Sequence, residues 1–438
     1  MSLNVGFVST RFSGIDGVSM EAAKWSEVID TLGHRSYWFA GESDRSPGRS
    51  FVEPKAHFKT ALNERINRCI TLDREPDFDA DAAIQERKAE LEAALFSFLE
   101  TYNINFLIVE NAISIPMQVP LGLAIRDVLS KLRIPTIAHH HDFYWERGRF
   151  HFNGYRKRIQ RTFPPDLPNV RHVVLNSIAQ RRLFERTGIT SQIIPNVMDY
   201  SNPPAIDQDR VSRLRTTIGV DPDDIMILQP TRMIARKGIE NTLEIVRRLN
   251  DARCKLIVSH KVDDEGWDYY RRITATCEKL GIDIRFIYGI VANPILNNFD
   301  PEAQYSLWEV YKAADLITFP SLNEGFGNAF LEAIFVKKPI VLNRYETFVA
   351  DIESKGFDII KFDERINSDT MDQVRSILSN KSRRQQMVET NYGLAKLNFS
   401  YDLLRKQLSG LIPSSHGSST AVSAEESLLG KYTTSGTC

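Results

Sequence analysis

The sequence predicts an α/β protein built from two doubly wound parallel-sheet domains. Its 438 residues exceed what a single hydrophobic core normally covers. Short apolar runs typical of buried strands alternate with helical patterns along both halves, which favours parallel strands joined by helices. A stretch rich in Pro, Asp and Asn at residues 200–222 separates the two series and marks the expected domain boundary.

Residues 1–200 form the expected first domain. Its first helix is supported by four apolar residues at helical spacing and by Gly33 as a stop. Residues 41–80 are rich in charge, Pro and Ser, and are interpreted as an excursion from the core with little regular structure. The expected elements are strands over 3–9, 36–40, 105–110, 134–141, 171–175 and 191–194, and helices over 18–32, 82–102, 120–132 and 177–187.

Residues 201–398 form the expected second domain, which is followed by a final helix over 399–411 and a tail over 412–438. The tail is rich in Ser, Thr and Gly and is predicted to be disordered. The second domain should hold strands over 225–230, 254–259, 282–288, 315–319 and 339–342, and helices over 237–250, 267–280 and 301–313.

Composition narrows the function classes. Apolar residues at 42% and charged residues at 25% are ordinary for a soluble globular protein. A net charge of −1 provides no general attraction to nucleic acid or to an anionic membrane. The four cysteines have no zinc spacing, and we see neither a secretory leader nor an apolar run of membrane-spanning length. We therefore expect a cytoplasmic protein with no nucleic-acid partner and no integral membrane segment.

The most informative stretch of the second domain is residues 319–335. A buried strand ends at Phe319, a loop places Glu324 beside two glycines, and Glu332 lies one to two turns into the next helix. Glycines let a backbone approach a ligand closely, and a helix N-terminus presents unpaired N–H groups. An ionised glutamate can accept hydrogen bonds from both hydroxyls of a ribose. The stretch therefore predicts a sugar-nucleotide site.

Two basic residues follow the first strand of the second domain, at the edge where open parallel sheets bind ligands. Arg232 can hold phosphate oxygens with two N–H groups, and Lys237 can add a point charge. Together they would neutralise a departing diphosphate. A solvated basic loop is an equal alternative on these residues alone.

Three histidines end a strand of the first domain. His139 and His141 share one face of the strand, while His140 points the other way. Their spacing suggests no third metal ligand, so no metal site is predicted. His141 comes just before the loop and is expected to face the cleft, where it would bond a sugar hydroxyl or orient an acceptor. Packing in the core is the alternative for His139 and His140.

Two further segments allow weaker predictions. Gly14 and Gly17 flank the turn after the first strand, a place that commonly approaches phosphate, but the turn lacks a dinucleotide fingerprint, which disfavours an NAD site. Residues 147–161 hold six basic residues and no acidic one, with aromatic residues interleaved. They offer a site for an anionic acceptor or a peripheral membrane contact, and a solvated loop is the favoured alternative.

Taken together, these motifs resemble the retaining glycosyltransferases of family 4, which have the GT-B fold of two facing Rossmann-like domains. The resemblance covers residues 5–411. Glu324 and Glu332 match the Glu-x7-Glu motif of the family, and His141 matches its strand-end histidine. Further matches are an interdomain segment, a stretch beside the nucleotide base and the start of a last helix that crosses back to the first domain, at residues 194–199, 286–291 and 399–402.

The resemblance implies a role for each matching residue. Arg232 and Lys237 would hold the donor phosphates, with Glu324 on the donor sugar and Glu332 on the ribose. No metal or other cofactor is implied. The implied catalytic residues are His141, Arg232, Lys237 and Glu324. The implied donor-binding residues are Gly17, Arg232, Lys237, Gly289, Ile290, Glu324, Gly325, Phe326, Gly327, Asn328 and Glu332.

Three positions depart from the family pattern. Asp16 stands in place of one glycine of a Gly-Gly pair, where its carboxylate would repel a diphosphate unless it points elsewhere. Residues 335–339 read Phe-Val-Lys-Lys-Pro in place of Ala-x-Gly-x-Pro, and residues 343–345 read Asn-Arg-Tyr where a glycine pair often stands. These departures leave the donor carboxylates in place and the acceptor unassigned.

The predicted function is transfer of a hexose from a nucleoside-diphosphate sugar, such as a UDP-sugar, to a hydroxyl acceptor with retention of configuration. A phosphorylase on the same scaffold is the enzymatic alternative, and Glu332 argues against it because inorganic phosphate carries no ribose. A nucleotide-sugar-binding protein without catalysis is the other alternative. The motifs do not identify the base, the sugar, the acceptor or the oligomeric state.

Overall fold

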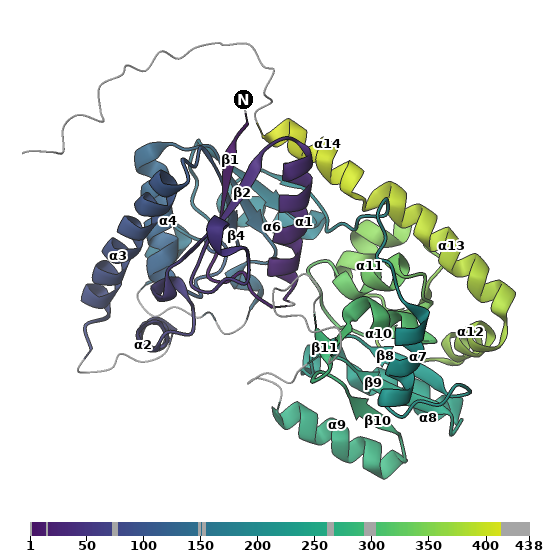
Figure 1. Cartoon of the computed structure of the whole chain (residues 1–438). Helices are drawn as coiled ribbons and strands as arrows, with labels where there is room; N and C mark the ends of the chain where they lie inside the picture. Colours follow the sequence, from purple (N-terminus) through teal and green to yellow (C-terminus); the bar gives the residue numbers. More distant parts are fainter. Residues whose placement is uncertain are drawn as a thin grey trace, which may run out of the picture.

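Two parallel sheets, each covered by helices on both faces, form two domains that lie side by side (Figure 1). The computed structural model describes residues 2–14, 16–71, 78–147, 150, 155–260, 267–292 and 304–412. The predicted fold class is confirmed. Most of the predicted tail, residues 413–438, lies outside the described residues.

The first domain is a seven-stranded sheet in the order β3-β2-β1-β4-β5-β6-β7, with every neighbouring pair parallel. Its strands are β1 (Asn4–Val8), β2 (Arg35–Ala40), β3 (Ser50–Val52), β4 (Phe106–Glu110), β5 (Thr136–His140), β6 (Val170–Val174) and β7 (Ser191–Ile193). Its helices are α1 (Gly17–Thr31), α2 (Ala61–Thr71), α3 (Ala80–Thr101), α4 (Val119–Leu132), α5 (Arg156–Gln160) and α6 (Ser177–Thr187), with short turns η1 (Pro47–Arg49), η2 (Pro54–Ala56) and η3 (Tyr144–Glu146).

The second domain is a six-stranded sheet in the order β10-β9-β8-β13-β14-β15, again all parallel. Its strands are β8 (Ile225–Gln229), β9 (Cys254–Val258), β10 (Ile284–Phe286), β13 (Leu316–Phe319), β14 (Ile340–Asn343) and β15 (Ile360–Phe362), beside a separate pair β11 (Val291–Ala292) and β12 (Tyr305–Ser306). The helices that follow residue 200 are α7 (Gln208–Thr217), α8 (Ile239–Leu249), α9 (Trp267–Leu280), α10 (Leu307–Ala313), α11 (Asn328–Phe335), α12 (Ser368–Ser379), α13 (Lys381–Asn398) and α14 (Tyr401–Leu411), with short turns η4 (Ala235–Lys237), η5 (Phe348–Ile352) and η6 (Glu353–Lys355).

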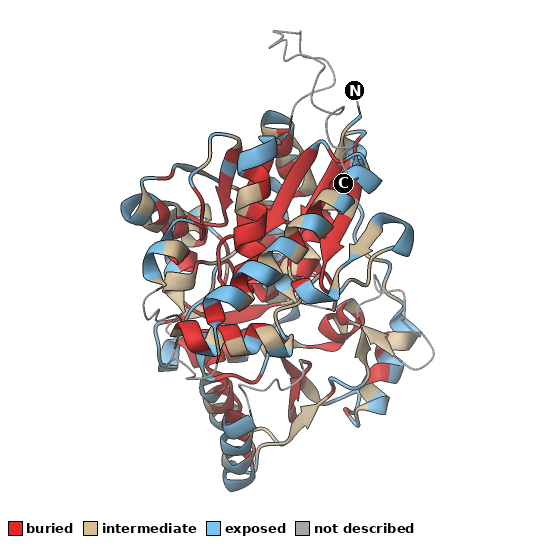
Figure 2. Cartoon of the chain, turned by 90° about the vertical axis from the view of Figure 1, so that its left-hand side faces the viewer, coloured by how far each residue is buried: buried red, intermediate tan, exposed pale blue. Residues whose placement is uncertain are grey.

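Successive strand residues face opposite sides of each sheet, so each sheet has two cores. In β1, Phe7 packs with residues of α1 and α14, whereas Val8 packs with residues of α3 and α4. In the second sheet, Leu228 and Ile227 divide in the same way between the α10–α11 side and the α8–α9 side. Figure 2 shows buried strands at the centre of the sheets and helices that are exposed on their outer faces, whereas strands such as β10 at a sheet edge are only partly buried.

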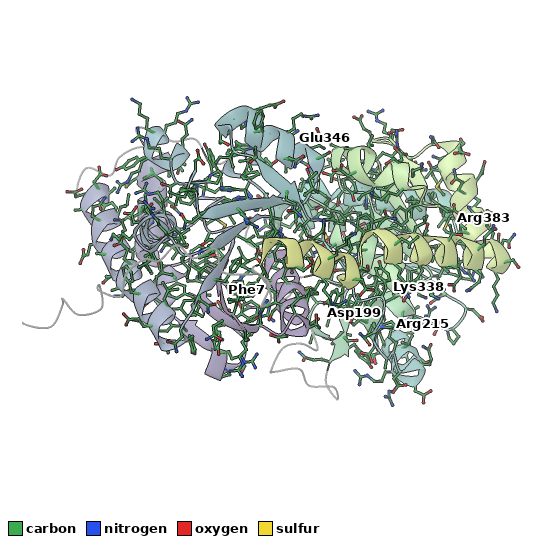
Figure 3. All side chains as sticks on the ribbon, turned by 90° about the horizontal axis from the view of Figure 1, so that it is seen from above. Phe7, Asp199, Arg215, Lys338, Glu346 and Arg383 are labelled. Atoms are coloured by element: carbon green, nitrogen blue, oxygen red, sulfur yellow. The ribbon has the colours of Figure 1, made fainter. Side chains whose placement is uncertain are left out.

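The last two helices join the domains. They lie end to end across the top of both sheets, α13 over the second domain and α14 over the first (Figure 3). Leu404 and Leu408 of α14 belong to the core cluster that contains β1 and α1. At the junction, the N–H of Met198 donates to the carbonyl of Phe399 at 2.9 Å, so the two chain crossings run side by side.

Two segments hold regular structure that the sequence patterns did not predict. Residues 41–80 were expected to hold little regular structure, and this is wrong: they contain the edge strand β3 and the helix α2, which buries Ile66 and Ile70. The boundary stretch contains a helix, α7, whose first N–H groups are capped by Asp207. Part of the expected helix 301–313 lies outside the described residues, and its described portion begins at Leu307 after a capping box formed by Ser306 and Glu309.

Candidate active site

The Glu324 loop joins β13 to α11 at the carboxyl edge of the second sheet. Its last residue, Gly327, adopts φ +105° and precedes α11. An added Cβ there would lie 2.4 Å from the hydroxyl of Tyr345, so glycine is required by both conformation and space. That hydroxyl donates to the carbonyl of Phe326 at 2.7 Å. The hydroxyl of Thr347 donates to the carbonyl of Glu324 at 2.9 Å. The segment that departs from the family after β14 therefore supports the loop.

Lys237 and Glu324 form a buried ion pair between the β8 and β13 edges. Lys237 contacts Oε1 of Glu324, and Arg236 lies 3.5 Å from Oε2 of the same carboxylate. Burial would raise the pKa of Glu324, but the two cations hold it below its ordinary value. Burial lowers the pKa of Lys237, and Glu324 opposes that shift. A carboxylate and an ammonium are thus held together in an environment with little water.

Arg232 is exposed and lies on the same edge. Its charge contributes to the lowered pKa of Lys237, which follows mainly from burial. His260, just after β9, was not singled out in the sequence. Burial lowers the pKa of His260 to about 4, and Lys237 and Arg232 contribute to the shift. A neutral imidazole therefore adjoins the basic edge of the sheet. The sequence could have indicated His260, because it follows a strand of the same sheet.

Glu332 lies in α11 with its carboxylate buried. The hydroxyl of Tyr311, from α10, donates to its Oε2 at 2.5 Å. Burial raises the pKa of Glu332, and the hydrogen bond from Tyr311 with the charges of Lys24 and Lys237 opposes this. Lys24 belongs to α1, so the first domain contributes a positive charge near this carboxylate.

Four contacts from the first domain reach the Glu324 loop. An added Cβ on Gly325 would lie 3.0 Å from the carbonyl of His141, so these two backbones are in close approach. Asn176 donates from Nδ2 to the carbonyl of Gly325 at 2.6 Å. Asn196 donates to Oδ1 of Asn328 at 2.5 Å, and an added Cβ on Gly17 would lie 3.3 Å from the other amide atom of Asn328. The structure therefore brings Gly17, His141 and the Glu324 loop together.

His139 and His141 do have a third candidate ligand beside them, a carboxylate that their spacing did not suggest. Glu110 at the end of β4 is fully buried, and its Oε2 lies 3.0 Å from Nδ1 of His139 and 2.8 Å from Nε2 of His141. The three candidate ligand atoms lie within 4.8 Å of one another. The sequence indicated this carboxylate only by placing one charged residue, Glu110, at the end of an otherwise apolar strand.

Asp16 takes a position that the family pattern did not predict. Its Oδ1 accepts hydrogen bonds from the N–H groups of Val18 and Ser19 at 3.2 Å each, so the carboxylate caps α1. Its Oδ2 lies 3.2 Å from Arg11. The N-terminus of α1 therefore already carries an anionic group of its own, neutralised by an arginine. The phosphate contact predicted at Gly17 stays a prediction.

Two predicted parts of the site are not joined to this cluster. Gly289 is an exposed turn residue after β10, and Ile290 packs against the core of the second domain. Over the part of the chain that the structure describes, no hydrogen bond or ion pair links them to Glu324 or Lys237.

In the basic segment 147–161, Arg147 pairs with Asp142 and Arg158 pairs with Asp81, so acidic residues outside it balance part of its charge. Residues 148, 149 and 151–154 lie outside the described residues.

No helix in the described part of the chain is long and apolar enough to cross a membrane.

The fold is shared with solved glycosyltransferases. A glycosyltransferase from Rickettsia africae ESF-5 matches with a TM-score of 0.63 and 16% identity, covering 94% of this chain and 98% of that one. HepE of Anabaena, in complex with UDP and glucose, matches with a TM-score of 0.62 and 14% identity, covering 93% and 98%. The predicted GT-B architecture is confirmed.

Sequence comparison identifies the family as well as the fold. Residues 212–393 match the family model described as glycosyl transferases group 1. The chain is 29% identical to mannosylglucosylglycerate synthase of Petrotoga mobilis, over 82% of this chain and 86% of that protein. It is 32% identical to mannosylglucosylglycerate synthase of Thermotoga maritima, over 93% of this chain and 99% of that protein. The predicted enzyme class is confirmed, and the chain belongs to the group 1 glycosyltransferases.

Proposed function

We propose that this glycosyltransferase moves a hexosyl group from a nucleoside-diphosphate sugar to a hydroxyl acceptor, with retention of configuration as in family 4. The observation that supports this most is the buried Lys237–Glu324 pair beside Arg232 and Arg236. It combines a carboxylate for sugar hydroxyls with cations for phosphate oxygens at one sheet edge. The neighbouring His141 comes from the opposite domain.

The chemistry follows from these charges. Departure of a nucleoside diphosphate leaves negative charge on its phosphate oxygens, which Arg232 and Lys237 would stabilise. Glu324 would then exchange part of its contact with Lys237 for hydroxyls of the donor sugar. If the acceptor attacks from the face that the diphosphate leaves, no nucleophile of the protein is required. Glu332, already oriented by Tyr311, would accept hydrogen bonds from the ribose.

We further propose that the product is of the mannosylglucosylglycerate class. The support is that both relatives are mannosylglucosylglycerate synthases, and that the match spans 93% of this chain and 99% of the Thermotoga protein. In such a product the terminal sugar is mannose, so the donor would be a mannose nucleotide and the acceptor hydroxyl would lie on a glucosylglycerate. The acceptor would then be an anion.

The test is a donor and acceptor panel. UDP-, GDP- and ADP-linked mannose and glucose are each offered with glucosylglycerate, and the products are analysed by NMR for anomeric configuration. A mannosylated product that keeps the configuration of the donor is expected. An inverted product contradicts the retaining assignment, and absence of turnover with every donor contradicts the proposed function. Added inorganic phosphate with disaccharides tests the phosphorylase alternative.

A further inference from the structure

We propose that Glu110 is a positioning residue for the transfer reaction: it holds the His141 imidazole by its Nε2–H and leaves Nδ1 to the bound sugar or acceptor. The inference rests on the proposed function, because it takes His141 to face a bound sugar. Glu110 itself does not need to touch substrate.

The placement follows from the sheet. β4 and β5 are adjacent and parallel, and Glu110 is paired in register with His139. His139 and His141 lie two residues apart, so their side chains are on the same side of the sheet. The Glu110 carboxylate therefore meets both rings, at 3.0 Å from Nδ1 of His139 and 2.8 Å from Nε2 of His141.

The hydrogen-bond chemistry selects one free ring nitrogen. An ionised carboxylate only accepts, so both imidazoles donate to Glu110. The remaining nitrogen of His139, Nε2, is buried without a partner in the described part of the chain, and the ring stacks on Trp25 with centroids 4.1 Å apart. His139 is thus closed to ligands. Nδ1 of His141 is the nitrogen left for one, and the His141 side chain retains 9% exposure.

The charges reinforce this arrangement. Burial would raise the pKa of Glu110, but His139 and His141 lower it to about 2, so the group is a carboxylate at neutral pH. Burial would lower the pKa of His141, but the hydrogen bond and charge of Glu110 raise it above its ordinary value. Burial lowers the pKa of His139.

Two other charged groups act on His141 from the elements around it. Glu21 of α1 and Asp142 of the following loop favour its protonation, and the charge of His141 in turn helps to lower the pKa of His139 in β5, which falls mainly through burial. Glu21 is bonded to Lys24 at 2.9 Å and Asp142 to Arg147, so both of these carboxylates are already compensated. Glu110 has no cation of its own other than the imidazoles among the described residues, and it is the group that contacts the ring directly.

The backbone of His141 is held independently of its ring. Its N–H donates to Oδ1 of Asn111 at 2.8 Å. Nδ2 of the Asn111 side chain donates in turn to Oδ1 of Asp142 at 2.9 Å. The carbonyl of His141 lies against Gly325 of the other domain. Asn111 therefore sets the position of the main chain, whereas Glu110 sets the orientation and charge of the ring.

Glu110→Gln is the first test, because it keeps the shape of the side chain and removes its charge. We expect kcat to fall by about tenfold to a hundredfold, with a much smaller change in donor KM. His141 should give up its proton more readily without the carboxylate, so the step in the pH–activity profile that follows the titration of His141 should move to lower pH. Glu110→Asp restores the charge with a shorter reach and should recover part of the rate.

A buried carboxylate elsewhere supplies the matched control. Glu309 is bonded to Arg210 in the second domain. Glu309→Gln is expected to reduce stability without moving this step in the pH–activity profile. A pH profile of Glu110→Gln that coincides with that of the unaltered enzyme overturns the proposal.

A readout without substrate separates this inference from the proposed function. Histidine is labelled with ¹³C and ¹⁵N, and His141 is assigned with the His141→Gln variant. NMR titration should show a lower His141 pKa in Glu110→Gln and loss of the fixed Nε2–H tautomer. Unchanged titration overturns the positioning role even if turnover is found, whereas a shifted titration supports it even if every donor fails. Elemental analysis completes the test: a metal that copurifies and is lost in Glu110→Gln would make the three residues a metal site and overturn the proposal.

Discussion

At the scale of single residues, the site depends on charges that are buried together. Glu110 and Glu332 are buried, Lys237 and Glu324 are largely buried, and each of the four has a specific partner. Removing one member of such a pair leaves the other charge buried and uncompensated, which costs more than the pair contributes. Substitutions here should therefore affect both catalysis and stability, so controls for stability matter.

Lys237→Ala should lower kcat by about a hundredfold to a thousandfold, the usual effect of removing one group that stabilises a developing negative charge. Lys337 serves as the control, because it is also a lysine paired with a glutamate, the exposed Glu389 at 2.8 Å. Steady-state kinetics with a saturating donor measure the effect. Equal losses in Lys237→Ala and Lys337→Ala would contradict a specific role for Lys237 on the diphosphate.

At the scale of elements, the candidate site is built from the ends of strands and helices. The N-terminus of α1 is occupied by Asp16, and β5 ends where His141 meets the Glu324 loop. The opposite face of β5 carries His140, whose Nε2 lies 2.9 Å from Nδ1 of His172 in β6. These contacts lead to one prediction on capping and one on acid sensitivity.

Asp16→Ala should cost about 1 kcal/mol in the free energy of unfolding, because α1 loses its cap. Asp207→Ala is the matched control, since Asp207 caps α7 through two N–H groups in the same way. Both variants are compared by urea denaturation. Only Asp16→Ala should also bind nucleoside diphosphate more tightly, as it removes a negative charge from the N-terminus of α1. Unchanged nucleotide binding would place Asp16 away from the donor phosphates.

The buried histidine pair should make the first domain sensitive to acid. Burial lowers the pKa of His172 to about 4. The unfolded chain takes up this proton near its ordinary pKa of about 6.5. The unfolded state therefore binds more protons between these values, and the free energy of unfolding falls as pH drops, by about 1.4 kcal/mol per pKa unit. His172→Gln should be less stable at neutral pH, as His140 loses its partner, yet lose less stability between pH 7 and 5. The measurement is the urea midpoint of each protein as a function of pH. The same decrease with falling pH in His172→Gln and in the unaltered protein would contradict the prediction.

Sequence patterns were sufficient where a signal is local. The helices over 177–187 and 267–280 match their predicted bounds, because apolar spacing defines both. The role of Glu110 depends on which strands become neighbours and in which register, and neither is written in a local pattern. Tyr345 is similar: its hydroxyl supports a loop 19 positions earlier in the chain, a contact that only the fold creates. The helix α2 was missed because its flanks rich in charge and Pro hid an amphipathic stretch.

At the scale of the whole molecule, the two domains are tied by side chains and by the chain itself. Arg182 of α6 pairs with Glu346 at 2.9 Å, and Asn176 and Asn196 bond the Glu324 loop. Helix α14 completes the core beside β1 and α1 although it lies at the other end of the sequence. Stability of the first domain thus depends on residues beyond position 400.

Leu404→Ala should lower the free energy of unfolding by about 2–5 kcal/mol, since Leu404 is fully buried in that core. Leu397→Ala near the end of α13 is the control: this side chain is 76% exposed, and its removal should change stability by at most about 0.5 kcal/mol. Urea denaturation compares the two. Limited proteolysis should show earlier cleavage in the first domain of Leu404→Ala, and cleavage restricted to the second domain would contradict the assignment.

The position of α14 also bears on how the protein is made. During synthesis the first domain leaves the ribosome long before residues 401–411 exist, so the apolar residues that will pack against Leu404 and Leu408 are uncovered while the second domain is still being translated. A nascent chain in this state exposes an apolar strip next to β1 and α1, which is the kind of surface that chaperones bind. Residues 401–411, which are made after the whole second domain, therefore complete the core of the domain that emerged first.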